Sequence, residues 1–213
     1  MRPLDLRRFT EWCESGSVDL NTPLSIDSSF RFPLQNQRAR REVLWGAVLL
    51  VLLPGVGWLL NMGHRIQMVH RMQNGLDPWP SWQNYSGLLR DGSVTFLGML
   101  YYYTPGFLLW YLKGFWWGFP LLVAATLAIP GYMTNYCKRF DYREIFNPLK
   151  AFSRALYGGA GYWRAWAIAL RALALSFVGL PFGLGFLVTS VWFWQVAGFS
   201  FASVFSASEV DEE

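Results

Sequence analysis

Long apolar blocks separated by short basic segments form the main pattern along this chain of 213 residues. Four blocks contain no Asp, Glu, Lys or Arg, at residues 43–63, 92–112, 114–137 and 172–208. A helix that crosses the hydrocarbon core of a bilayer needs about 20 mostly apolar residues. Four such blocks in one short chain predict an all-α integral membrane protein, and they exclude an ordinary soluble domain.

The first block contains a proline–glycine break, which leaves two interpretations of its path. Residues 43–63 are long enough to form one spanning helix that is kinked at Pro54. Alternatively, the chain turns at Pro54-Gly55-Val56-Gly57 and returns to the same side, with arms that are too short to span. Such a hairpin must pack against other helices, because unpaired backbone is not tolerated in contact with lipid.

The distribution of basic residues favours the hairpin, because cytoplasmic segments are enriched in Lys and Arg. If 43–63 spans, the segment 138–164, with six basic and two acidic residues, falls outside. If 43–63 is a hairpin, this segment, the N-terminal tail and residues 64–90 all lie inside, and Lys113 alone lies outside. We therefore predict a cytoplasmic N-terminus and a Pro-broken N-terminal hairpin, followed by about four transmembrane helices.

Amphipathic segments are expected at the cytoplasmic surface. The first follows the hairpin and has an apolar face formed by Met62, Ile66, Val69 and Met72. It is expected to end at Gly75, before a stiff loop in which Trp79 and Trp82 suit the level of the lipid headgroups. A second amphipathic stretch begins at Phe140 and is interrupted by Pro148.

Composition divides the chain into three regions. Residues 1–37 are polar and of mixed charge, which predicts a cytoplasmic tail. The alternative is a segment that docks on a partner through Leu24, Phe30, Phe32 and Leu34. Residues 38–206 form the predicted helical membrane domain, and residues 207–213 form an acidic C-terminal tail. The net charge of +4 comes from clusters that suit an anionic lipid surface, so we expect the bilayer as a partner and no nucleic acid.

Few residue types are spaced for chemistry. Cys13 and Cys137 are too far apart to define a disulfide framework or a metal site. His64 and His70 are six residues apart, unlike the i,i+4 pair that binds zinc, and are expected on a solvated helix face. The alternative is an axial ligand to a pigment or haem. No phosphate-binding glycine loop, nucleophile elbow or paired-carboxylate motif is present, so we expect no cofactor, no metal and no enzymatic activity.

Five positions are candidates for an interface or a lipid-headgroup site. Arg164 and Arg171 share a helical face near one end of an apolar block, where an ionisable side chain is a functional candidate by default. The structural alternative is that Arg171 extends back to the membrane surface. The other candidates are His64, Trp79 and Trp82.

Several short elements occur in a characteristic order: Leu53-Pro54, Gly63, Arg71, Gly75, Pro80-Ser81-Trp82, Asp91-Gly92, Tyr102 with Pro105, and Phe140-Asp141-Tyr142-Arg143-Glu144-Ile145. In this order the chain, over roughly residues 40–205, resembles a prokaryotic membrane family catalogued as domain of unknown function 4013. The departures are His64, Trp79 and Lys138-Arg139, where the family has other residue types. The resemblance implies a bacterial inner or internal membrane, and it implies no activity because the family has none assigned.

These patterns favour a non-enzymatic accessory, assembly or scaffold subunit of a larger membrane complex, with a membrane-protein partner or self-association. The alternative is a small transporter or permease whose broken helices line a site. A third hypothesis is a lipid-active enzyme that uses the interfacial carboxylates Asp77 and Asp91.

Overall fold

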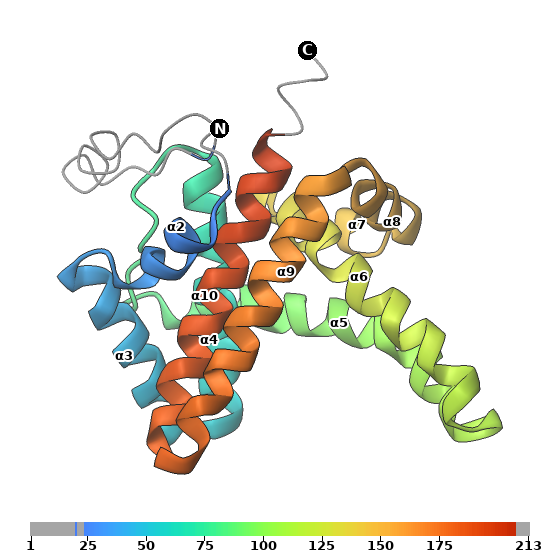
Figure 1. The fold of residues 1–213 in the computed structure, drawn as a ribbon, viewed down its shortest axis with the longest axis horizontal. Coiled ribbons are helices and arrows are strands. Elements are labelled where there is room, and N and C mark those ends of the chain that lie inside the picture. Colours follow the sequence, from blue (N-terminus) through green and yellow to red (C-terminus); the bar gives the residue numbers. More distant parts are fainter. Residues whose placement is uncertain (1–19, 21–23, 208–213) are drawn as a thin grey trace.

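The computed structural model describes Leu20 and residues 24–207, and each regular element in this part of the chain is a helix (Figure 1). Most of the predicted N-terminal tail, with Cys13, and the acidic residues after 207 lie outside the described residues. Three helical segments are long and apolar enough to cross a membrane: Phe115–Arg139, Gly159–Phe182 and Leu184–Ser206. The chain is therefore an all-helical protein with the composition of a multi-pass membrane protein. The block at 92–112, which was also expected to span, belongs to α5 (Tyr85–Lys113) and is not one of these three.

Helices α3 (Gln37–Leu52) and α4 (Pro54–Gln73) form an antiparallel pair that meets at Leu53. Pro54 lies in the first turn of α4, where its missing N–H breaks no helical hydrogen bond. The amide of Asn61 donates to the carbonyls of Gly46 (3.0 Å) and Gly57 (2.8 Å), so it links the two arms. The chain therefore reverses direction within the block 43–63.

Two further antiparallel pairs follow. Helix α5 turns at Gly114 (φ 96°) into α6 (Phe115–Arg139). Helix α9 (Gly159–Ser176) continues through the 3₁₀ segment η2 (Phe177–Phe182) and turns at Gly183 (φ 56°) into α10 (Leu184–Ala207). The positive φ angles explain glycine at both turns. All three connecting turns point to the lower side of Figure 1, while α7, α8 and the ends of the described chain lie at the upper side.

Close backbone contact fixes the crossing of α4 and α5. A methyl group on Gly63 would collide with the carbonyl of Leu88, and one on Gly92 would collide with the carbonyl of Leu59. Small residues allow helices to approach in this way in membrane proteins, where side-chain packing replaces the hydrophobic effect as the driving force. Helix α10 then packs against α3, α4 and α9, and its residues Val196 and Ala202 are fully buried.

Residues 24–36 are part of the fold, so folded structure begins before the predicted domain boundary at residue 38. They form α2 (Ile26–Arg31) and the 3₁₀ turn η1 (Phe32–Leu34). Phe32 is 2% exposed and stacks between Trp79 (5.1 Å) and Phe199 (4.6 Å). The aromatic residues that stood out in the tail therefore pack against helices of this same chain.

Candidate functional site

Glu42 and His64 form a buried polar contact between α3 and α4. Glu42 Oε2 lies 3.3 Å from His64 Nε2, and the two side chains are 6% and 2% exposed. The His64 ring stacks on Trp82 at 4.1 Å, so the loop after α4 covers it. Burial lowers the pKa of His64, although Glu42 acts in the opposite direction. The expectation of a solvated histidine is therefore wrong at His64, because tertiary packing places the loop on this face.

Trp79 is buried rather than placed at the headgroup level. It is 1% exposed and stacks on Phe32. Arg38 donates to the carbonyl of Trp79 (2.8 Å) and pairs with Asp77 (2.7 Å), which ties the loop to the start of α3. Among the sequence candidates in this loop, Trp82 alone keeps part of its surface exposed.

Arg164 and Arg171 lie two turns apart on α9, and both are exposed. They line one groove with Leu24, Ser25 and Ile26 from the start of α2. The structure therefore brings these two arginines together, as their spacing predicted. No carboxylate between residues 24 and 207 pairs with either of them.

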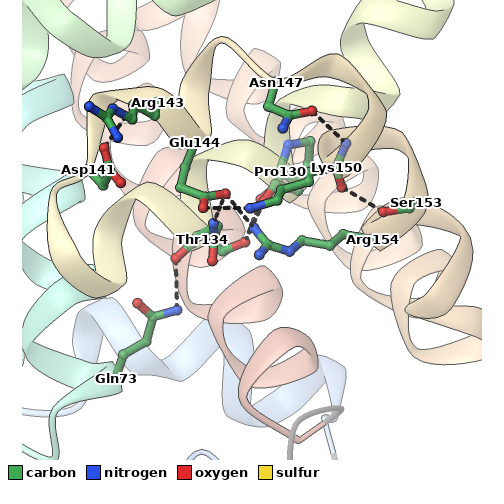
Figure 2. Close-up of polar contacts among 12 residues, drawn as sticks. Gln73, Pro130, Thr134, Asp141, Arg143, Glu144, Asn147, Lys150, Ser153 and Arg154 are labelled. Atoms are coloured by element: carbon green, nitrogen blue, oxygen red, sulfur yellow. Dashed lines mark hydrogen bonds and ion pairs between the residues drawn. The ribbon is translucent and has the colours of Figure 1, made fainter.

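A polar cluster centred on Glu144 fastens α7 (Tyr142–Ile145) and α8 (Pro148–Tyr157) to α6 (Figure 2). The Glu144 carboxylate accepts a hydrogen bond from the Asn135 amide and pairs with Lys150 Nζ (3.0 Å) and Arg154 Nη1 (3.8 Å). Burial lowers the pKa of Arg154, and the charge of Glu144 opposes this shift. The arrangement is a structural tie between three helices, since Glu144 joins Asn135 on α6 to Lys150 and Arg154 on α8.

The Glu144→Gln variant should loosen α7 and α8 from α6. The amide keeps the shape of the side chain but removes the charge that Lys150 and Arg154 face, so we expect a loss of about 1 kcal/mol for these partly exposed pairs. Limited proteolysis between α6 and α9 measures the opening, and Asp141→Asn at the exposed start of α7 is the matched control. Equal cleavage of Glu144→Gln and the wild type would contradict this role.

The other interfacial carboxylates are engaged separately. Asp77 pairs with Arg38, and Asp141 accepts from the backbone N–H of Arg143 (3.0 Å) as the N-cap of α7. Asp91 is 1% exposed inside α5 and accepts from Gln67 (3.0 Å). Each carboxylate thus has its own structural partners, and Asp77 and Asp91 share none of them.

An apolar cavity with a volume of about 330 Å³ lies among α4, α5, α6, α9 and α10. Its wall includes side chains from the α5/α6 pair and from the α9/α10 pair, among them Tyr103, Ile129, Trp166, Leu173 and Trp194. Arg65 is the one charged side chain among its lining residues, and it is 8% exposed. Ligand pockets in proteins have volumes of about 300–1,000 Å³ and mostly apolar walls.

Sequence reasoning missed Arg65 because it was counted with the basic residues at the membrane surface. A signal was present. Arg65 lies three residues after Met62 and four before Val69, so its helical phase places it on the apolar face of α4. A charged residue on a buried helical face is the pattern that marks a functional candidate in a membrane protein.

Comparison of the chain with protein-family models, with curated proteins and with solved structures gave no match. The resemblance to the domain of unknown function 4013 therefore stays a prediction.

Proposed function

We propose that this chain is a non-enzymatic multi-pass membrane protein that works as a subunit of a larger membrane assembly. Its contact surface is the outer part of α5 and α6, residues 104–124, called here the α5/α6 arm. The arm diverges from α9 and α10 in Figure 1 and projects from the rest of the molecule. The projection of this arm is the observation that carries the proposal.

The arm is dense in large side chains that the rest of this chain does not cover. Tyr111 is 88% exposed, Trp116 is 81% exposed and Trp117 is 67% exposed. The two helices use their small residues against each other, since Gly106 faces Leu122 and Gly118 faces the Gly106 carbonyl. The outer faces therefore remain available. Tyr and Trp are the residue types enriched at protein interfaces, and Trp and Tyr also mark membrane interfaces.

Photocrosslinking tests the proposal directly. A photoreactive amino acid at Tyr111 or Trp116 should give a crosslink to one defined membrane protein in cells, and the same protein should co-purify in mild detergent. Phe182, which is 77% exposed at the turn between α9 and α10, is the control position of matched exposure. Crosslinks to lipid alone from the arm, together with a monomer in detergent, would overturn the proposal.

In this proposal the turns after α5 and after α9 lie on the outer side of the membrane, the turn at Leu53 lies within the bilayer, and the basic segments lie in the cytoplasm. The α3/α4 hairpin then enters the bilayer and returns, while α5 crosses it as a fourth span. In a cysteine-free background, Ser81→Cys and Ser153→Cys should react only from the cytoplasmic side, and Phe182→Cys should react only from the outside. Labelling of Ser81→Cys from the outside would favour a spanning block at 43–63.

A second candidate, a small permease, is favoured by the cavity among five helices. Its threonine hydroxyls, however, bond to helix carbonyls. Thr104 donates to the Leu100 carbonyl (2.6 Å), and Thr189 donates to the Ser176 carbonyl (2.7 Å). A site built to carry a polar solute needs unpaired polar groups, so a permease of this architecture would carry an apolar or amphipathic solute. Solute uptake by the purified chain in liposomes would support this second candidate over the first.

A further inference from the structure

Arg65 is a buried cation whose side-chain contacts are a thioether sulfur and an aromatic ring. Its Nη2 lies 3.7 Å from Met133 Sδ, and its Cζ lies 4.5 Å from the centre of the Trp194 ring. A guanidinium has five N–H donors, and neither a thioether nor a ring face is a strong acceptor for them. No carboxylate among the described residues forms an ion pair with it, although buried charges are normally paired.

The Arg65 guanidinium faces the apolar cavity, whose hydroxyl groups already have partners. The indole N–H of Trp166 on the same wall has no hydrogen-bond partner in the part of the chain that the structure describes. Tyr103 Oη and Thr126 Oγ1 bond to each other at 2.9 Å, and Thr134 Oγ1 donates to the Pro130 carbonyl at 2.7 Å. The cavity therefore offers one strong positive site and an otherwise mostly apolar wall. A matching ligand has a compact anionic head and an apolar body.

The cavity lies where α5 and α6 diverge from α9 and α10. One wall comes from Ile129 and Met133 on α6, and the other comes from Trp166 and Leu173 on α9. In a membrane, molecules that reach a space between diverging helices come from the lipid phase. The ligand is therefore one that resides in the bilayer.

We propose that this cavity binds a long-chain acyl carboxylate, with its oxyanion against Arg65 and its chain along α6, α9 and α10. A carboxylate matches the guanidinium in two parallel hydrogen bonds. The wall is mostly apolar, and the indole N–H of Trp166 is one further donor on it. This favours a single-chain carboxylate over a phospholipid, whose ester and phosphodiester oxygens need several donors. This inference is independent of the partner proposed for the α5/α6 arm.

A chain-labelled photoreactive oleic acid tests the proposal with the purified full-length protein in phosphatidylcholine nanodiscs. Labelling should map to residues of α6, α9 and α10 and should be displaced by unlabelled oleate. Methyl oleate has the same chain without the charge and should compete at least tenfold less well. Phosphatidylglycerol supplies the alternative anionic head, and stronger competition by it than by oleate would overturn the carboxylate assignment.

Substitutions at two positions test the two halves of the site. Arg65→Met removes the charge at similar volume and should weaken displacement by oleate about tenfold or more, while Arg65→Lys should restore part of it. Arg164→Met on the exposed face of α9 is the matched control and should bind as the wild type does. Leu173→Trp keeps Arg65 and fills the cavity, so it should lower labelling even if Arg65→Met does not fold. Wild-type labelling in folded Arg65→Met, or in Leu173→Trp, would overturn the proposal.

Discussion

Gly63→Ala and Gly92→Ala should each destabilise the protein by about 3 kcal/mol, because an added methyl group has no room in this backbone contact. The added Cβ atoms would meet the carbonyls of Leu88 and Leu59, which belong to helix backbone and cannot rotate away. Separating α4 from α5 is then the only relief, and it would disturb the Asp91–Gln67 hydrogen bond that bridges the same two helices. The midpoint of thermal unfolding in detergent measures the effect.

Gly55→Ala is the matched control for these substitutions. Gly55 lies in α4, as Gly63 does, yet nothing lies within 4 Å of the position that an added Cβ would take. Alanine is a better helix former than glycine by about 1 kcal/mol, so this variant should be neutral or slightly more stable. A Gly63→Ala protein as stable as Gly55→Ala would show that α4 and α5 do not make the close contact described.

His64→Phe should cost about 3–5 kcal/mol, because it leaves the Glu42 carboxylate buried without its partner. The phenyl ring keeps the stacking on Trp82, so the loss reports the polar contact and not the packing. The double variant Glu42→Met/His64→Phe replaces both polar groups with apolar ones of similar size, and we expect it to recover most of the lost stability.

A double-mutant cycle gives the coupling between the two residues. Glu42→Met alone leaves a neutral imidazole, which is the form that burial favours, so it should cost less than His64→Phe. Additive losses in the double variant would contradict a direct Glu42–His64 interaction. Arg31→Met is the control, since its pair with Asp27 is exposed and should contribute about 1 kcal/mol or less.

Much of the helical pattern was predictable because helices long enough to span a membrane are recognisable as long apolar runs in the sequence. The blocks at 114–137 and 172–208 are continuous apolar runs, and both lie largely in helices that are long enough to span. The end of α4 before Gly75 was also predictable, since glycine accommodates the positive φ angle there. The path at Pro54 was left open by the sequence, and the turn lies at Leu53, with Pro54 and the glycines after it in the first turn of α4.

Burial of polar residues was less predictable. The histidine face was assigned to solvent because residues 64–74 carry many polar side chains. In the structure the loop at 79–82 covers His64. Nothing in the sequence of these two segments indicates that they are in contact. Asp91 was expected among the interfacial carboxylates. Asn84 accepts from the Gly87 N–H and caps α5, which begins six residues before Asp91, so Asp91 lies inside the helix and is buried.

The sequence by itself determined the helical class and the apolar blocks of spanning length, because these depend on local composition and backbone chemistry. It left open whether the chain reverses within residues 43–63. Only the tertiary structure decided which polar residues are buried. It paired Glu42 with His64 and placed Arg65 on a cavity wall. The physical reason is that burial depends on which helices meet, and in a membrane the meeting of helices is governed by shape and close packing more than by hydrophobicity.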